Sequence, residues 1–178
     1  MARAYVSIGS NIEPANNVLA ALRLLAAAFG PLVCSSVYRT PAVGFEGEDF
    51  LNMVVGLDTG APPLALAARL RAFEDECGRQ RGGARFSART LDLDVLTWDD
   101  AVFEDGKFVL PRPEITEQAF VLGPLAEIAG GERHPVLQRT YAELWAAMRP
   151  SAHAMEREAL PGLEAIPQRP VTGKEQDS

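Results

Sequence analysis

The pattern of apolar and polar side chains predicts four β-strands. They are expected at Arg3–Ile8, Leu32–Tyr38, Phe50–Asp58 and Leu91–Thr97. Successive side chains of a strand point to opposite faces, so alternate residues line one face. In segment 50–58 one face is apolar throughout, and we expect it to face the core while the other face is free to form a site. That apolar face comprises Leu51, Met53, Val55 and Leu57.

A period of 3.6 residues predicts two helices between these strands. The first begins at Pro14, which suits the first turn of a helix, and ends before Gly30. The second begins after Pro63 and stops at Gly78, because glycine commonly follows the last helical turn.

The C-terminal third has a weaker pattern. An extended segment, Lys107–Leu110, precedes two predicted helices, Thr116–Ala129 and about Thr140–Met148. In residues 149–178 prolines recur and the hydrophobic period fades. We therefore predict a single domain, residues 1–148, followed by a tail that is loosely packed or disordered.

The predicted order of the first six elements is β-α-β-β-α-β. This order is typical of the ferredoxin-like fold, an α+β fold in which helices pack on one face of an antiparallel sheet. The helices that follow would be C-terminal additions. A sheet that is covered on one face leaves the other face for a ligand, and we expect four side chains there: Phe50, Asn52, Asp92 and Asp94.

The composition is that of a globular protein, since 47% of the 178 residues are hydrophobic and 23% are charged. The sequence has no apolar run long enough to cross a membrane, and its start lacks the features of a signal peptide, so we expect a cytoplasmic protein. Cys34 and Cys77 are expected to be buried thiols. The net charge of −7 argues against a nucleic-acid-binding protein, which usually concentrates basic charge on one face.

Candidate chemistry lies in the segment Arg79–Leu96, RQRGGARFSARTLDLDVL. Residues two apart in a strand share a face, so Asp92 and Asp94 point together, about 6–7 Å apart along the backbone. Carboxylates with few other protein ligands suit Mg²⁺, whose coordination is usually completed by water and substrate phosphates. Both histidines, His134 and His153, fall late in the chain, so the pair favours magnesium over zinc.

Four arginines precede these aspartates, and on their own they indicate no more than a solvated charged loop. Beside a magnesium site they gain a role, because guanidinium groups on a glycine-containing loop can close over phosphate oxygens. The chain lacks a GxxxxGK[ST] loop and the kinase HRD and DFG motifs, which excludes the common nucleotide-binding designs. The four residues are Arg79, Arg81, Arg85 and Arg89.

Four motifs resemble those of the 6-hydroxymethyl-7,8-dihydropterin pyrophosphokinase family: YVSIGSN, SSVYRTPAVG, FLNMVVGL and RFSARTLDLDVL. The resemblance covers about Ala4 to Ala129. Enzymes of this family belong to the folate pathway and move pyrophosphate from ATP to a pterin alcohol, and the resemblance implies this activity and the ferredoxin-like fold. Ser87 stands where glycine is usual in the family, and Phe86 where tryptophan is frequent.

The resemblance also implies a role for individual residues. Asp92 and Asp94 would hold two Mg²⁺ ions that bridge the triphosphate, and Asp92 is in addition a candidate general base that contacts the substrate. Phe50 and Phe120 would sandwich the pterin ring, while Asn52 would bind its edge. Backbone groups around three further residues would complete the pterin pocket: Thr40, Pro41 and Val43.

For ATP, the resemblance implies that Arg79 and Arg81 clamp the nucleotide and promote transfer, and that Arg85 and Arg89 lie near the phosphates, where Arg89 also takes part in catalysis. Five further residues are expected to contact ATP: Arg71, Glu74, Lys107, Val109 and Arg112. The spacing of Arg71 and Glu74 alone indicates only an ion pair on a helix surface.

Two positions depart from the family pattern. Arg112 stands where histidine is common, and Gln118 where an arginine often contacts phosphate. These changes leave the expected metal and pterin sites intact, and the properties they would affect are the affinity for the nucleotide or the rate.

Two other functions are compatible with the sequence. One is a paralogue that acts on a different pterin-like alcohol, and the other is a noncatalytic ferredoxin-like module whose arginines contact an acidic partner. The aspartate pair argues against the module, since a surface that binds anions gains nothing from two carboxylates. In the favoured interpretation the partners are small molecules, ATP and the pterin, and the chain is compatible with a monomer.

Overall fold

The computed structural model describes residues 1–41, 48–79, 91–152 and 155–171, with only the backbone of Arg79. A six-stranded sheet forms the centre of the molecule, with strand order β5-β1-β4-β3-β8 and with β2 also paired to β4. All of these pairings are antiparallel. The strands are β1 Ala2–Ser10, β2 Val33–Cys34, β3 Tyr38–Thr40, β4 Phe50–Thr59, β5 Asp92–Trp98 and β8 Glu156–Arg157.

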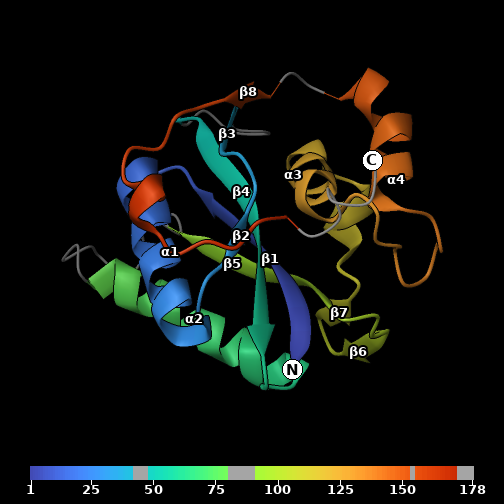
Figure 1. Ribbon diagram of the computed structural model, residues 1–178, viewed down its shortest axis with the longest axis horizontal. Helices are drawn as coiled ribbons and strands as arrows, with labels where there is room; N and C mark the ends of the chain where they lie inside the picture. Colours follow the sequence, from blue (N-terminus) through green and yellow to red (C-terminus); the bar gives the residue numbers. More distant parts are fainter. Residues whose placement is uncertain (42–47, 80–90, 153–154, 172–178) are drawn as a thin grey trace.

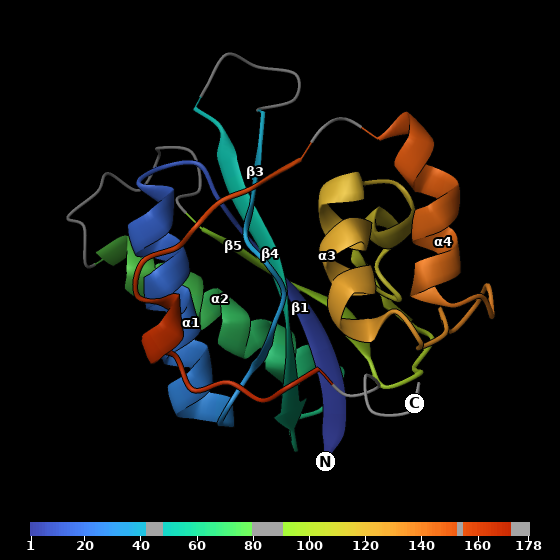
Figure 2. The same ribbon diagram turned by 45° about the horizontal axis from the view of Figure 1, so that its top comes forward.

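Helices cover both faces of this sheet (Figures 1 and 2). Helices α1 (Pro14–Phe29) and α2 (Pro63–Arg79) lie together on one face. Helices α3 (Ala119–Ala129) and α4 (Tyr141–Met148) pack on the other face. The sequence predicted helices on one face only, and this is wrong because Tyr5, Val54 and other apolar side chains also point to the second face, where α3 covers them.

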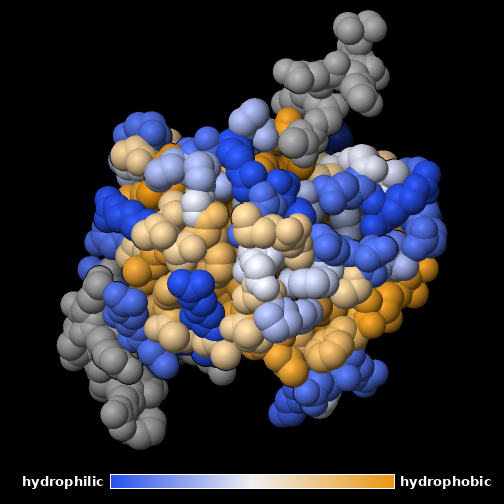
Figure 3. Space-filling view, turned by 60° about the horizontal axis from the view of Figure 1, so that its bottom comes forward, coloured by the Kyte–Doolittle hydropathy of each residue, from blue (hydrophilic) through white to orange (hydrophobic). Residues whose placement is uncertain are grey.

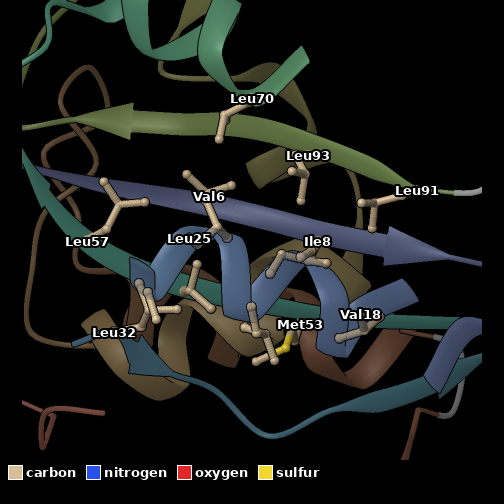
Figure 4. Close-up of a cluster of buried hydrophobic side chains, with 14 of the residues drawn as sticks. Val6, Ile8, Val18, Leu25, Leu32, Met53, Leu57, Leu70, Leu91 and Leu93 are labelled. Atoms are coloured by element: carbon tan, nitrogen blue, oxygen red, sulfur yellow. The ribbon is translucent and has the colours of Figure 1, made fainter. Parts of the chain in front are cut away.

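The larger hydrophobic core lies between the sheet and helices α1 and α2 (Figure 4). Val6, Ile8 and Leu93 enter it from the strands, while Leu25 and Leu70 enter it from the two helices. All five side chains are at most 1% exposed. This packing fixes the strands in register, and the register decides which residues meet on the opposite face.

The predicted helices agree well with the structure, apart from their ends. The predicted helix Thr116–Ala129 begins instead with a 3₁₀ turn, Pro113–Thr116, and becomes α-helical at Ala119. The predicted extended segment Lys107–Leu110 contains the turn residue Lys107 and one strand of a hairpin that the sequence did not indicate. It consists of β6 (Phe103–Asp105) and β7 (Phe108–Leu110).

The predicted strand Leu32–Tyr38 is interrupted. It divides into β2 and β3, and between them Ser36 donates its backbone N–H to the carboxylate of Glu127 on α3. Ser35 meanwhile bonds to Val54, with its side-chain oxygen accepting from the Val54 N–H at 2.9 Å. The regular ladder with β4 is therefore interrupted at Ser36, whose partner Glu127 is distant in the sequence.

Residues 155–171 are packed against the sheet and its core. Leu160 and Ile166, each 5% exposed, belong to the larger core, and β8 pairs with β3. Leu32 donates its N–H to Pro167 O at 2.9 Å, and Arg169 donates its N–H to Leu32 O at 2.8 Å. The prediction of a loosely packed tail is therefore wrong for these residues.

The surface in Figure 3 carries hydrophobic patches that hydrophilic side chains interrupt. Within the described ranges, no helix is long and apolar enough to cross a membrane. Of the two cysteines, Cys77 is buried as predicted, whereas Cys34 is only partly buried. Burial raises the pKa of the Cys34 thiol to about 12, so it is protonated at neutral pH.

Candidate active site

A cavity of about 330 Å³ opens on the face of the sheet that α3 covers in part. Strands β1, β3, β4 and β5 supply its floor, and the N-terminal turn of α3 supplies part of its wall. The structure brings together here every described residue that the sequence predicted for metal and pterin: Thr40, Pro41, Phe50, Asn52, Asp92, Asp94 and Phe120. Arg112, predicted for ATP, also lines the cavity.

The strand register sets three of these positions in one row across the sheet. Gly9 on β1 is paired with Asn52 on β4 and with Asp92 on β5. Neighbouring strands lie about 4.8 Å apart, so Asn52 and Asp92 are separated by roughly 10 Å. The middle position has no side chain, and the row presents an amide and a carboxylate at its two ends.

Asp92 and Asp94 point to the cavity, as the alternation in β5 predicted, and Leu93 between them points to the core. A β-bulge at Leu96 is where the pairing of β1 with β5 shifts by one residue. Ser7 on β1 pairs with Asp94, one row beyond Gly9. The two carboxylates thus occupy adjacent positions along one edge of the cavity floor.

Cations from two elements already contact Asp94. Arg71 Nη2 lies 2.9 Å from Asp94 Oδ1, and Arg112 Nη2 lies 3.7 Å from the same oxygen. Arg112 also pairs with Glu114, with Nε 2.6 Å from Oε2. Positive charge therefore compensates Asp94 at the edge of the cavity.

Glu74 links this ion pair to the backbone of β5. Arg71 Nη1 lies 2.6 Å from Glu74 Oε1, and Glu74 Oε2 accepts the Leu93 N–H at 2.8 Å. Burial raises the pKa of Glu74, and the nearby charge of Asp92 raises it further, while the hydrogen bonds from Leu93 and Arg71 oppose this shift. Arg71 and Glu74 do form the helix-surface ion pair that their spacing indicated. Arg71 also contacts Asp94, so three charged side chains are joined.

The donor set at Asp92 and Asp94 suits a hard divalent cation that keeps external ligands. Both groups offer only carboxylate oxygens, the ligands that Mg²⁺ prefers. No cluster of three or more His, Cys, Asp or Glu side chains capable of holding a metal ion occurs in the part of the chain that the structure describes. Two carboxylates would hold Mg²⁺ only with water or phosphate oxygens, which is how this ion is usually bound.

The opposite end of the row is suited to a flat ring with polar edges. Phe50 from β4 and Phe120 from α3 both line the cavity and are partly buried. Asn52 is 9% exposed, and its Nδ2 donates to Thr40 Oγ1 at 2.7 Å. Aromatic side chains and a directional amide together favour a planar heterocycle over a flexible apolar ligand.

Several predicted residues do not line this cavity. Arg71 and Glu74 approach it only through Asp94. Lys107 lies exposed in the turn between β6 and β7, while Val109 lines a second cavity of about 430 Å³ that shares Arg112 with the first. Five other predictions lie outside what the structure describes, namely Val43, the side chain of Arg79, and Arg81, Arg85 and Arg89.

The structure also adds residues that sequence reasoning did not select. Ser7 and Gly9 line the cavity and alternate with Val6 and Ile8, so strand alternation could have identified them. Glu114 also lines it, after the cis peptide bond between Leu110 and Pro111, and no local pattern marks this residue. Four apolar residues complete the added set: Ile8, Met53, Leu96 and Val121.

Comparison with known proteins identifies the family of this chain. The family model for 7,8-dihydro-6-hydroxymethylpterin-pyrophosphokinase matches residues 5–130. A 2-amino-4-hydroxy-6-hydroxymethyldihydropteridine pyrophosphokinase of Methylorubrum extorquens is 43% identical over 141 residues, which cover 74% of this chain and 89% of that protein. The protein with the same name from Bacillus subtilis is 39% identical over 129 residues, covering 70% of this chain and 77% of its own.

Solved structures show a similar fold at low sequence identity. Crystal structures of Plasmodium falciparum HPPK-DHPS match with a TM-score of 0.70 and cover 88% of this chain, at 13% identity for a triple mutant and 12% for the wild type with pteroate. This chain spans about half the length of those proteins, 46% and 47%. The family resemblance predicted from the motifs is confirmed, and the chain belongs to the 7,8-dihydro-6-hydroxymethylpterin-pyrophosphokinase family.

Proposed function

We propose that this protein transfers the pyrophosphate group of ATP to 6-hydroxymethyl-7,8-dihydropterin in folate biosynthesis, giving the pterin diphosphate and AMP. Its family and the names of its relatives support this reaction. The observation that carries the proposal is the row of Asn52, Gly9 and Asp92 across three strands. It supports the proposal because an amide that could bind the edge of a ring and a carboxylate lie at the two ends of one row.

The pterin would lie over Gly9 with its amide edge toward Asn52. A bicyclic ring with its hydroxymethyl group is comparable in length to the roughly 10 Å between the ends of the row. Phe50 and Phe120 would contact the two faces of the ring. In this orientation the hydroxymethyl oxygen points toward Asp92, which is where the reaction has to take place.

The two aspartates would hold magnesium together with the triphosphate oxygens. A bound Mg²⁺ would supply charge neutralisation for the phosphates at this position. Asp94 would supply the carboxylate oxygen that Arg71 does not contact, or exchange its guanidinium partner for the metal. Most of the rate enhancement then comes from positioning and charge stabilisation.

The chemical step replaces one phosphorus–oxygen bond by another. The hydroxymethyl oxygen attacks the β-phosphorus, and the bond from that phosphorus to the oxygen bridging to the α-phosphate breaks, so AMP departs with the bridging oxygen. The proton of the attacking hydroxyl passes to Asp92, which we assign as the general base. Arg79, Arg81, Arg85 and Arg89 would stabilise the charge on the transferred group.

The nucleotide would extend from the aspartates across Arg112. Arg112 lines both cavities, and Val109 lines the second, which supports a path for ATP from one to the other. A guanidinium at position 112 can donate two parallel hydrogen bonds to phosphate or ribose oxygens, where histidine would offer one donor at a time. Lys107, in the neighbouring turn, would contribute a cation at the outer edge.

The proposal also covers the topology of the first six elements, the oligomeric state and the place of the reaction in the cell. The strand order β5-β1-β4-β3, with α1 and α2 on one face, supports a ferredoxin-like arrangement of the first six elements. The proposed active unit is a monomer. We place the reaction in the cytoplasm, where ATP is available.

The test is a product assay with three omissions. Protein, MgATP and 6-hydroxymethyl-7,8-dihydropterin should give equal amounts of AMP and pterin diphosphate, and omission of Mg²⁺, ATP or the pterin should abolish both. AMP without pterin diphosphate, or ADP as the product, would reject the proposal. Magnesium-dependent binding of a nonhydrolysable ATP analogue without turnover of this pterin would favour a paralogue, and no such binding would favour a noncatalytic module.

A further inference from the structure

We infer that Thr40 is a positioning residue for the substrate, and that its hydroxyl acts through Asn52 by anchoring the inner end of the Asn52 amide. The inference rests on the proposed function, because Asn52 is the residue proposed to bind the pterin edge. It concerns the Thr40 side chain, whereas the sequence had indicated only backbone groups around this position.

The anchor is a short contact between two buried groups. Asn52 Nδ2 lies 2.7 Å from Thr40 Oγ1, and the two residues are 9% and 7% exposed. Their strands are adjacent, but Thr40 pairs with Phe50 and Asn52 pairs with Tyr38, so the bond runs diagonally across the β3–β4 ladder. Diagonal neighbours lie about 7–8 Å apart, a gap that the two polar side chains bridge together.

The other end of the amide is also confined. A Cβ atom at Gly9 would lie 3.0 Å from Asn52 Oδ1, so the amide oxygen occupies the space that the glycine leaves open. Thr40 on one side and the Gly9 backbone on the other therefore restrict the rotation of the Asn52 side chain. A side chain that is already ordered loses less conformational entropy when it binds a ligand.

The anchored amide retains the groups that a ligand needs. Asn52 Oδ1 accepts no hydrogen bond within the described residues, and Nδ2 has a second hydrogen beyond the one given to Thr40. A hydroxyl can accept or donate, so Thr40 fixes the plane of the amide in either of its two flipped orientations. These two free groups of the Asn52 amide suit a ring that carries a hydrogen-bond donor beside an acceptor. A cyclic amide with an amino substituent is such a ring.

The role predicts a specific pattern in a double-mutant cycle. Thr40→Val keeps the shape and removes the hydroxyl, so it should weaken pterin binding about 2- to 10-fold, the range expected for freeing one ordered side chain. Thr40→Ser keeps the hydroxyl and should bind within about 2-fold of the wild type. In an Asn52→Ala background, Thr40→Val should have no further effect, since the group it positions is gone.

The experiment is a fluorescence titration of the four variants and the wild type with 6-hydroxymethyl-7,8-dihydropterin, in the presence of Mg²⁺ and a nonhydrolysable ATP analogue. Thermal unfolding checks that each variant folds, and steady-state kinetics should show the loss in the KM for pterin with a smaller change in kcat. Equal losses from Thr40→Val in both backgrounds would overturn the inference, as would a Thr40→Ser variant as weak as Thr40→Val, or no loss at all.

Failure of the positioning role is distinguishable from failure of the proposed function. An active wild type whose Thr40 and Asn52 losses are additive rejects only the positioning role. A wild type that forms no AMP and binds no pterin rejects the proposed function, and with it the role of Thr40 toward this substrate.

Discussion

Arg71 on α2 and Asp94 on β5 form an ion pair at the edge of the cavity, with Nη2 2.9 Å from Oδ1. The same guanidinium contacts both oxygens of Glu74, at 2.6 and 2.7 Å. Without a metal, a protein cation thus compensates one of the two acids proposed to bind Mg²⁺. Arg71 and the metal should therefore compete for Asp94.

Replacing Arg71 by Met should lower the stability of the metal-free protein by about 1 kcal/mol or less, since a half-exposed arginine contributes little by itself. Addition of Mg²⁺ should then raise the melting temperature of the variant more than that of the wild type, because the metal no longer displaces a guanidinium. Thermal unfolding with and without MgCl₂, at matched ionic strength, measures both effects.

Arg23→Met is the matched control, since Arg23 is exposed on α1, away from the cavity. Its response to Mg²⁺ should equal that of the wild type. If Arg71→Met gained no more from Mg²⁺ than this control does, the competition between Arg71 and metal would be disproved.

Replacing Asp94 by Ala should reduce AMP formation by at least about 100-fold, as the loss of a group that stabilises transition-state charge commonly does. The fold should persist because the Asp94 side chain lies at the cavity edge and is 22% exposed. Asp100→Ala, an exposed acid in the turn after β5, should retain full activity. Normal AMP production by Asp94→Ala would remove the metal assignment.

The sequence predicted those parts of the fold that depend on local pattern. Strand β4 and helix α1 were found because their apolar side chains repeat with the correct period over many residues. The break at Ser36 could not be found, because its cause is Glu127, a hydrogen-bond partner 91 residues away. Ile166 likewise belongs to no periodic segment, and it is buried only because the chain returns to the core.

For the site, the sequence predicted which residues share a face of a strand but not which residues are opposite one another. The side chains of Asp92 and Asp94 were paired by alternation alone. The row that joins Asp92 to Asn52 through Gly9 depends on strand register, which the packing of the core determines. The contact of Arg71 with Asp94 depends in addition on how α2 lies against β5.

Replacing Ile166 by Ala should destabilise the protein by about 2–3 kcal/mol, in the lower part of the range for a buried aliphatic residue. Ile166 is 5% exposed and belongs to the larger core, although it lies in the segment that the sequence assigned to a loose tail. Urea unfolding measures the change. Val136→Ala, at a side chain that is 57% exposed, should cost less than about 0.5 kcal/mol. Similar small effects at both positions would mean that the tail is not held in solution.

The stability of the protein should fall as the pH decreases through about 6.5, in part because of His134. This residue is 6% exposed, and its Nδ1 accepts the N–H groups of Val136 and Leu137 at 3.2 and 3.1 Å, which requires an unprotonated nitrogen. Burial lowers the pKa of His134 in the folded state, so below pH 6.5 the unfolded chain binds a proton that the folded chain does not. The stability from neutral His134 is therefore fully present above the unfolded pKa and is lost as the pH falls from there toward the folded pKa.

His134→Asn keeps an acceptor near the Nδ1 position without a titrating group. Urea unfolding between about pH 7 and 5 should therefore show that the stability of the variant depends less on pH than that of the wild type. Carboxylates contribute equally to both proteins, and parallel curves would show that His134 is not the group responsible.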